Sequence, residues 1–332
     1  MKNQGTLFLH YPCFDGIVSA ALAAHVLMHA QGWRIRTIEP VDYSVAKSWL
    51  ARKLPEKSAV VDFLYHPDAE FWADHHETSF LNRDDRSAYT VGQADGFTRL
   101  YDPTAVSCAG LIFSKYTYVL AADVFRDMAA WADKIDGARY ATVEEAVLGS
   151  GAATDINLSL AFGDRRYCKF LVRSLENSTL EELSRSSEVL RRAERAKEEI
   201  SRGLQRVARS LRVVGGDIAV MDVAQSKGIV INRYSPYLYA RDARYSVSLV
   251  RSHAGAKITA MRNPWLDFES VDLGTLFRRF GGGGHQRVAS VLVSPGRGAA
   301  ALLEEVVSAI SLADSGQNNQ ERPTHDRKVQ FL

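Results

Sequence analysis

Three clusters of histidine, aspartate and cysteine near the start of the chain have the composition of metal ligands. The first, HYPCFDG, contains His10, Cys13 and Asp15; the second is Asp62, and the third is residues 74–76 (DHH). Carboxylate and imidazole groups bind Mn²⁺, Fe²⁺, Co²⁺ and Zn²⁺. Two such ions roughly 3.5–4 Å apart can share a hydroxide and hold a phosphoryl group. One isolated His–Asp pair is usually structural, but three clusters in one domain favour a metal site.

Each cluster lies at the end of a segment that is predicted to be a β-strand. Four strands are expected here, at residues 6–10, 34–39 and 58–62 and in a segment that ends near Trp72. A loop over residues 11–16 and an apolar helix from residue 17 to about residue 30 follow the first strand. Alternating strands and helices up to about residue 150 predict an α/β fold with a doubly wound, mostly parallel sheet. Ligands bind at the carboxyl ends of such strands, where the clusters fall.

The chain has 332 residues, which favours two domains over one. We expect a metal-binding domain over residues 1–178 and a helical linker over 179–212, formed by one long helix or two in tandem. A smaller mixed α/β domain should cover residues 213–313, and the polar residues 314–332 should form a disordered tail. The many Arg residues of the linker are most simply a solvated helix face balanced by Glu; a surface that steers phosphates is the alternative.

Composition narrows the cellular setting. The net charge of +2 does not suit a protein that coats nucleic acid. Three irregularly spaced cysteines, Cys13, Cys108 and Cys168, do not form a disulfide framework and fit a reducing compartment. Neither a signal-peptide core nor a run of roughly 18 apolar residues is found. The sequence therefore predicts a cytoplasmic protein without a membrane partner.

A glycine-rich segment lies far downstream, where Phe280 is followed by four glycines and His285. Consecutive glycines allow the backbone to approach an anion closely and to direct N–H groups at it. Such a run is more often a flexible loop, so by itself it is a weak signal.

The order of these motifs resembles the DHH phosphoesterase superfamily. The residues that carry the resemblance are His-x-x-Cys-x-Asp-Gly, then Asp62, then Asp-His-His at 74–76, and finally Gly-Gly-Gly-His ending at His285. They resemble the branch with a DHH-associated C-terminal domain, which includes RecJ-type exonucleases, nanoRNases, bisphosphate-nucleotide phosphatases and cyclic-dinucleotide phosphodiesterases. The likeness spans roughly residues 6–295, and the glycine-rich motif argues against the inorganic pyrophosphatase branch.

The resemblance implies two divalent metal ions, most simply Mn²⁺, with Asp62 as the bridging ligand. His10 and Cys13 would complete the first site. Many family members carry Asp at the Cys13 position, and a thiolate ligand would favour Zn²⁺ or Fe²⁺, with Co²⁺ a further candidate. Alternatively, water completes the first site in place of Cys13.

The second ion would be bound by Asp15, His75 and a later aspartate. Asp133 in the sequence AAWADKID is the preferred match to that aspartate, and Asp136 is the alternative.

The resemblance also implies roles in catalysis and substrate binding. His76 would face the substrate phosphate, and Asp74 would support the histidines. Together with Asp62 they are the expected catalytic residues. The expected phosphate-binding residues are Gly282, Gly283, Gly284 and His285. Arg251 and Arg262, at the ends of predicted strands, are either further phosphate contacts or ordinary surface residues.

The resulting hypothesis is a two-metal phosphoesterase that uses a metal-bridging hydroxide. Its preferred substrate is a small nucleotide: a short single-stranded oligonucleotide or a bisphosphate nucleotide, with no stable binding to duplex nucleic acid. One alternative is a phosphodiesterase or phosphatase for another small phosphate compound, such as a cyclic dinucleotide. Another is a non-catalytic ligand-binding protein, for which Cys13 is the single supporting residue. The sequence leaves open whether the chain forms a homodimer.

Overall fold

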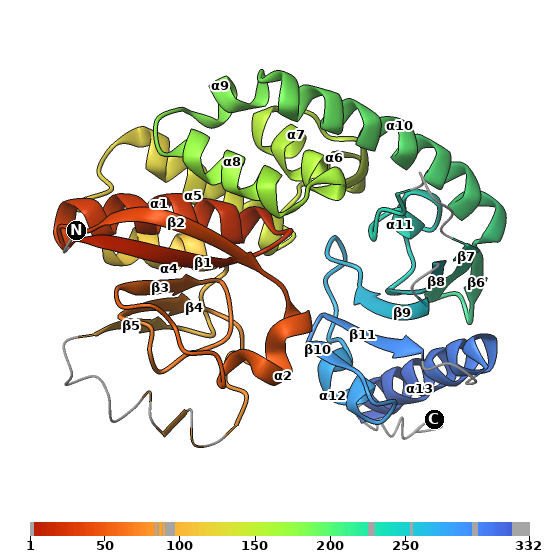
Figure 1. Ribbon diagram of the computed structural model, residues 1–332. Helices are drawn as coiled ribbons and strands as arrows, with labels where there is room; N and C mark the ends of the chain where they lie inside the picture. The colour runs from red at the N-terminus through yellow and green to blue at the C-terminus, as the bar shows by residue number, and fades with distance from the viewer. Residues whose placement is uncertain are drawn as a thin grey trace, which may run out of the picture. The chain divides into compact units, whose positions relative to one another are not determined.

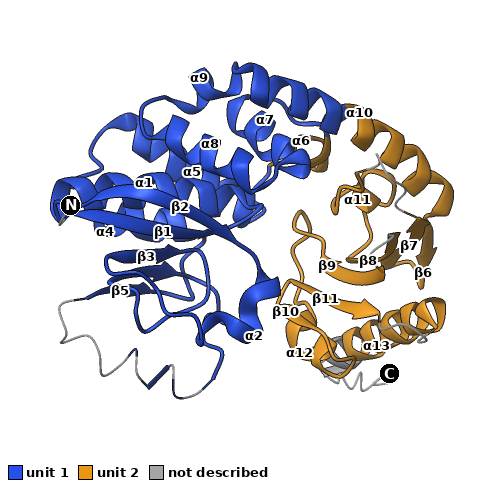
Figure 2. Cartoon of the chain, in the orientation of Figure 1, with its two compact units in different colours: residues 1–140, 148–197 blue, residues 141–147, 198–332 orange. Residues whose placement is uncertain are grey.

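The computed structural model describes residues 3–82, 84, 86, 87, 89, 97–224, 230–252, 255–293 and 298–320 (Figure 1). The chain forms two compact units, which are coloured separately in Figure 2. Unit 1 comprises residues 1–140 and 148–197, and unit 2 comprises residues 141–147 and 198–332. The division therefore falls inside the helical segment that the sequence analysis assigned to a linker.

Unit 1 is built on a five-stranded parallel sheet with the order β2-β1-β3-β4-β5. Its strands are β1 (Gln4–His10), β2 (Arg34–Val41), β3 (Ser58–Val61), β4 (Phe71–Asp74) and β5 (Thr98–Tyr101). This parallel sheet confirms the predicted α/β fold. Because β2 and β3 lie on opposite sides of β1, the winding reverses between β1 and β3, and ligands of such sheets bind at this switch point.

The two faces of this sheet are covered by different parts of the chain. One face carries Leu7 and Leu9 and packs against helices (Figure 1). The helices and short 3-10 turn in that layer are α1 (Phe14–Ala30), α4 (Cys108–Lys115), α5 (Asp123–Asp136), α7 (Ala152–Ser159), η3 (Leu160–Phe162), α8 (Arg165–Leu175) and α9 (Leu180–Ser184). The other face carries Phe8 and Trp72, which pack against Trp49 and Phe63. The period-two alternation of side chains along each strand produces this separation.

Short elements cover the second face where it approaches the switch point. These are the 3-10 turn η1 (Tyr43–Val45) and α2 (Ala46–Trp49). The predicted linker proves to be two helices in tandem, α9 and α10 (Ser187–Ser210). A capping box of Thr179 and Glu182 starts α9.

Unit 2 contains a mixed six-stranded sheet with the order β10-β11-β9-β8-β7-β6. β7 and β8 are parallel, and the other neighbouring pairs are antiparallel. The strands are β6 (Arg212–Val214), β7 (Ile218–Ala224), β8 (Tyr245–Ser252), β9 (Gly255–Arg262), β10 (Gly283–His285) and β11 (Val288–Val293). The helices are α6 (Val143–Leu148, which ends in unit 1), α11 (Pro236–Tyr239), α12 (Leu273–Arg278) and α13 (Ala299–Gln320). The mixed sheet confirms the predicted α/β character of the C-terminal part.

The expected end of ordered structure at Asp314 is wrong. α13 continues to Gln320, and the Asp314 side chain is buried, accepting hydrogen bonds from the Tyr245 hydroxyl (2.7 Å) and from Arg244. Tyr245, the first residue of β8, and the preceding Arg244 therefore hold this part of α13 in place. The polar sequence of the segment does not reveal these contacts. The remainder of the predicted tail, residues 321–332, lies outside the described residues. Within the part of the chain that the structure describes, no helix is long and apolar enough to cross a membrane.

Candidate metal centre

The three predicted clusters meet at the carboxyl edge of the unit 1 sheet. His10 ends β1, Asp62 directly follows β3, and Asp74 ends β4. Asp15 reaches the same edge because α1 begins at Phe14, three residues earlier than the sequence analysis expected. The switch point between β1 and β3 therefore lies beside the predicted ligands.

Gly16 allows the first turn of α1 to approach β1 closely. A Cβ atom at this position would lie 2.3 Å from the carbonyl oxygen of His10 and 3.1 Å from a carboxylate oxygen of Asp62. A side chain here would therefore push the helix away from the sheet edge and take Asp15 with it. The glycine in the HYPCFDG motif is needed to bring the ligands together.

The side chains at this edge lie within the reach of shared ions. Asp62 lies 3.4 Å from His10 Nδ1 and 3.8 Å from His75 Nε2. His75 Nε2 also lies 3.7 Å from Asp15 and 3.5 Å from Asp136. Three groups, each with ligand atoms within 4.8 Å of one another, can be drawn: His10 with Cys13 and Asp62; Asp15 with His75 and Asp136; and Asp62 with Asp74, His75 and His76.

Four buried polar atoms in this cluster have no hydrogen-bond partner among the described residues. They are Nδ1 of His10, both carboxylate oxygens of Asp62 and Nε2 of His75. Buried polar atoms in folded proteins are nearly always satisfied, so unsatisfied groups need an explanation. Here they are two carboxylate oxygens and two imidazole nitrogens, the donor set that divalent transition metals take. The chemistry of these residues fits bound cations.

The orientation of His75 supports this fit. Its Nδ1 lies 3.1 Å from the carbonyl oxygen of Ala105, which can only accept a hydrogen bond. Nδ1 must therefore carry a proton, which in the neutral ring leaves the lone pair on Nε2, the nitrogen that faces Asp15 and Asp62. A backbone partner that fixes the tautomer in this way is typical of metal-ligating histidines.

Asp74 has the supporting position that the sequence analysis expected. One carboxylate oxygen accepts the backbone N–H of His75 and the ring Nδ1–H of His76, both at 2.8 Å, and the other accepts the hydroxyl of Ser79. Asp74 thereby orients both histidines. Ser79 was not among the predicted site residues, because a serine five residues after Asp74 carries no distinctive sequence signal.

Asp15 is held by the start of a helix. Its carboxylate accepts the backbone N–H groups of Cys108 (2.8 Å) and Ala109 (2.9 Å) in the first turn of α4, and the hydroxyl of Ser19 (3.1 Å). The positive end of the helix dipole favours an anion at this place. Burial and the nearby Asp136 nevertheless raise the pKa of Asp15 to about 6.

Asp62 is the most constrained member of the cluster. Its backbone adopts a left-handed conformation with φ of 53°, which Asp tolerates better than most residues. Burial and the Asp15 carboxylate raise its pKa well above the ordinary range. The chain thus buries several carboxylates side by side, an arrangement that cations stabilise and that is unfavourable without them.

The two remaining histidines are in opposite electrostatic situations. Burial, together with His76, lowers the pKa of His10, so its imidazole is neutral and able to bind a metal. Burial alone would lower the pKa of His76, but its hydrogen bond to Asp74 and the charges of Asp74 and Asp62 raise it to about 10. Bound cations would lower the pKa of His76 by repulsion.

Cys13 lies with His10 and Asp62 in the first group of potential ligands. Its enclosed position and the Asp62 carboxylate raise the pKa of the thiol well above its usual value. A thiolate would therefore form here only with a cation present. The geometry leaves Cys13 a candidate ligand, as expected.

The preference for Asp133 over Asp136 is not supported. Asp133 accepts a hydrogen bond from the Ser107 hydroxyl at 2.6 Å, and a Cβ atom on Gly110 would lie only 2.4 Å from its carboxylate. Ser107 caps the N-terminus of α4 through the backbone N–H of Gly110. Asp133 therefore packs against the helix start that holds Asp15. Asp136, the alternative, is the aspartate that approaches His75.

The glycine-rich segment forms the edge strand β10 of unit 2 and pairs with β11. A Cβ atom on Gly284 would lie 2.4 Å from the carbonyl oxygen of Val288, and its φ is 150°. A Cβ on Gly282 would lie equally close to the Ser290 carbonyl oxygen, whereas one on Gly283 would meet nothing within 4 Å. The packing thus explains two of these glycines but not Gly283. His285 is exposed beside them.

The two predicted arginines lie at strand ends, as expected, but both have partners within unit 2. Arg251 forms a two-pronged ion pair with Asp222, at 2.9 and 2.7 Å. Arg262 is buried and donates to the backbone carbonyl groups of Asn263 and Phe268. These contacts give Arg262 a structural role, and its role in binding phosphate stays a prediction.

A cation that the sequence analysis missed lies close in sequence to the glycine-rich segment. Arg287 follows His285 by two residues, is exposed, and makes no side-chain hydrogen bond or ion pair with the residues that the structure describes. The QR dipeptide after His285 was the only sequence signal for it.

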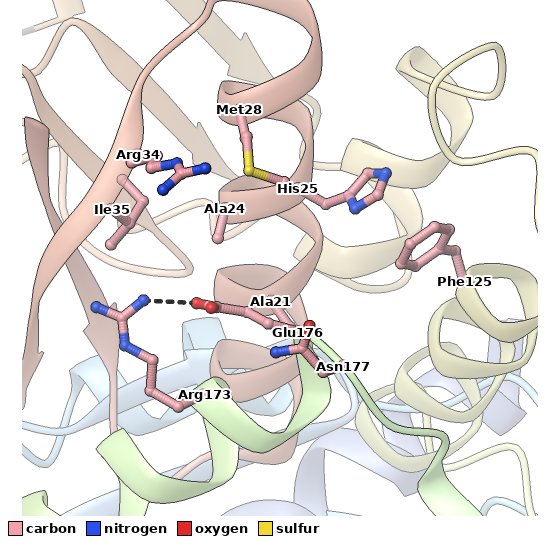
Figure 3. A pocket seen from close by; sticks show the side chains of 10 residues that line it. All are labelled: Ala21, Ala24, His25, Met28, Arg34, Ile35, Phe125, Arg173, Glu176 and Asn177. Atoms are coloured by element: carbon pink, nitrogen blue, oxygen red, sulfur yellow. Dashed lines mark hydrogen bonds and ion pairs between the residues drawn. The ribbon is translucent and has the colours of Figure 1, made fainter. Parts of the chain in front are cut away.

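Unit 1 also has a cavity of about 270 Å³ between the C-terminal half of α1, β2, α5 and α8 (Figure 3). Its walls include Ala21, Ala24, Phe125 and an ion pair of Arg173 with Glu176. None of the predicted site residues lines it. The candidate metal centre lies instead at the other end of α1, where the helix begins.

No protein-family model matches the chain, and no curated protein matches its sequence. Solved structures share its fold. A pGpG-specific phosphodiesterase from Vibrio cholerae, PggH, has a TM-score of 0.67 and 18% identity, over 92% of this chain and 99% of that one. A DHH domain described as a member of the s1p family of ribosomal proteins has a TM-score of 0.56 and 13% identity, over 93% of this chain and 86% of that one.

RecJ from Thermus thermophilus, solved with Mn²⁺, has a TM-score of 0.54 and 14% identity; the match covers 94% of this chain and 52% of RecJ. The chain therefore has the fold of the DHH superfamily, as its ordered motifs predicted.

Proposed function

We propose that this chain is a metal-dependent phosphoesterase that hydrolyses a phosphodiester bond in short linear oligonucleotides, dinucleotides in particular. The observation that carries the proposal is the set of four unsatisfied buried atoms on His10, Asp62 and His75. They lie at the edge of a sheet where this class of fold binds ligands. The DHH fold supports the same reaction class, and the pGpG specificity of the V. cholerae phosphodiesterase supports a linear dinucleotide.

The residues at this sheet edge would bind two metal ions. Asp62, which lies within reach of His10 on one side and His75 on the other, would bridge two ions. The remaining ligands would be His10 and Cys13 for the first ion, and Asp15, His75 and Asp136 for the second. When bound, the ions would supply an activated water and positive charge for the phosphoryl oxygens.

His76 would act directly on the substrate. Asp74 fixes its Nδ1, and the other ring nitrogen would contact a phosphoryl oxygen or protonate the leaving group. In unit 2, the half-buried Gly283 backbone, His285 and Arg287 would bind a phosphate, as the glycine-rich edge strand and the nearby cation suggest.

A substrate screen with Mn²⁺ tests the proposal. The panel should contain linear dinucleotides with a 5′-phosphate, 3′,5′-bisphosphate nucleotides, cyclic dinucleotides and pyrophosphate. We expect the linear dinucleotides to be cleaved fastest, with excess chelator abolishing the activity. Preference for a bisphosphate nucleotide or a cyclic dinucleotide would keep the phosphoesterase but replace the substrate. Turnover in chelator, or equal turnover by Asp62→Ala, would contradict the metal-dependent reaction.

A further inference from the structure

An aromatic side chain lies beside the candidate metal centre and has no role so far. Tyr43 begins η1, two residues after Val41, the residue of β2 that pairs with His10 in the sheet. Its ring meets the His10 ring edge-on, with 5.1 Å between the ring centroids and an interplanar angle of 66°. The sheet register itself therefore places Tyr43 next to a proposed metal ligand.

The ring is supported from beneath by buried aromatic residues. Tyr43 packs on Phe63 at 5.3 Å, and Phe63 in turn packs edge-on against Trp49 at 5.1 Å. Both Phe63 and Trp49 are completely buried, and the Trp49 indole N–H is fixed by the carbonyl groups of Leu64 and Tyr65. A ring that rests on such a base loses little further freedom when a ligand stacks on it.

The backbone that carries Tyr43 is also anchored. Asp42 caps η1 by accepting the backbone N–H of Ser44 at 2.8 Å. Arg165, at the start of α8, donates to Asp42 (3.3 Å) and to the Tyr11 hydroxyl (3.1 Å). The exposed ion pair contributes little stability alone. Together, the two Arg165 contacts join the loop after β1 and the loop after β2 to the start of α8.

Despite this support, Tyr43 is not part of the core. It is 44% exposed, whereas Phe63, Trp49 and Trp72 in the same aromatic cluster are fully buried. Its hydroxyl makes no hydrogen bond to the residues that the structure describes. A rigid aromatic surface left open beside a reaction centre is the kind of surface that proteins use to stack bases.

We propose that Tyr43 is the stacking surface for a nucleobase next to the scissile phosphate. The proposal rests on the proposed function, because it assumes that a nucleotide phosphate binds at the metal centre that includes His10 and Asp62. The Tyr43 ring lies 5.1 Å from the ring of His10, so a base stacked on it would lie beside a phosphate held at the metal centre. Stacking tolerates any base, so Tyr43 would favour nucleotides over other phosphate esters without selecting a sequence.

The test pairs variants of Tyr43 with matched substrates. The substrates are a 5′-phosphorylated dinucleotide and two analogues in which one or the other base is replaced by an abasic sugar. Stacking contributes about 1–3 kcal/mol per base, so Tyr43→Ala should lower kcat/KM for the dinucleotide about 5- to 150-fold. One abasic analogue should be hydrolysed equally by the wild type and Tyr43→Ala, because it lacks the stacked base. Tyr43→Trp should retain the wild-type preference.

Controls separate stacking from structural damage. Tyr118→Ala removes another exposed tyrosine, 72% exposed and remote from the predicted ligands in sequence, and should leave all three rates unchanged. Mn²⁺ content of Tyr43→Ala should equal that of the wild type. An equal loss on all three substrates would overturn the stacking role while leaving the proposed function intact. If the wild type cleaves none of the three substrates but cleaves another phosphate ester, the proposed substrate fails.

Discussion

The candidate metal centre of unit 1 and the glycine-rich strand of unit 2 were both predicted to act on phosphate, yet they are built in opposite ways. The metal centre consists of buried side chains whose ligand atoms lack partners among the described residues, although their surroundings are held by many hydrogen bonds. The strand β10 is an edge strand in which close backbone packing fixes Gly284, as it does the preceding Gly282, but not Gly283. A substitution in the first should remove function and spare the fold, whereas most glycine substitutions in the second should damage the fold first.

Asp62→Ala should have the largest effect on activity. It removes both unsatisfied carboxylate oxygens and hence a ligand shared by two ions. Loss of a single well-placed catalytic contact costs about 10²–10³ in rate, and this change should cost at least as much. Steady-state hydrolysis and metal content by mass spectrometry measure it. More than about a tenth of the wild-type rate would rule out a bridging role.

Asp136→Asn and Asp133→Asn form a matched pair one helical turn apart. Asp136→Asn should weaken Mn²⁺ binding about 10- to 100-fold or more. Loss of a residue that only hydrogen-bonds to a metal ligand already has an effect of this size, and Asp136 is proposed as a ligand itself. Asp133→Asn should leave Mn²⁺ binding close to wild type, since an amide oxygen can still accept from Ser107. Calorimetric titration with Mn²⁺ distinguishes them, and the reverse ranking would restore Asp133 as the ligand.

Gly284→Ala and Gly283→Ala compare two neighbouring glycines in the edge strand. The first would place a Cβ 2.4 Å from a backbone oxygen at a φ of 150°, so it should destabilise the protein by about 1–3 kcal/mol. The second meets no atom within 4 Å and should change stability by less than about 0.5 kcal/mol. Denaturant unfolding measures both. If Gly283→Ala raises KM without changing stability, the phosphate-binding role of this strand is supported; an unchanged KM argues against it.

The smallest expected effect is a pH dependence of stability without metal. Burial raises the pKa of Asp15 from its ordinary value of 3.8 to about 6 and that of Asp62 well above its ordinary value. The folded state then binds protons more tightly than the unfolded state, so stability should fall as the pH rises from about 4 through 6. Thermal unfolding in chelator should show a lower midpoint at pH 7.5 than at pH 5.5. Mn²⁺ should stabilise more at pH 7.5, and Asp62→Asn should flatten the slope in chelator.

The first three strands and the three clusters could be predicted because they rest on local sequence, whereas β4 begins near the residue where the fourth strand was expected to end and β5 was not predicted. Buried runs such as SAVVD and the spacing of the His and Asp residues are visible without tertiary contacts. The choice between Asp133 and Asp136 could not be made in this way, because both lie in the last turns of α5. Only the packing of α4, through Ser107 and Gly110, shows which carboxylate is already engaged.

The surroundings of the two arginines and the order of residues 314–320 could not be predicted for a related reason. The ends of β8 and β9 were placed correctly, but the partners of Arg251 and Arg262 come from distant residues or from backbone carbonyl groups. Asp314 likewise has the sequence context of a polar tail, and only its contact with Tyr245 shows otherwise. Tyr43 was overlooked because its importance depends on the register of β1 and β2.

The central claim is that Asp62 lies between two cations, and anomalous diffraction from crystals grown with Mn²⁺ tests it most directly. Two anomalous peaks roughly 3.5–4 Å apart are expected. One should contact His10 and the other Asp15, His75 and Asp136, with Asp62 contacting both. A single peak that does not touch Asp62, or no peak at this sheet edge at saturating Mn²⁺, would contradict the account.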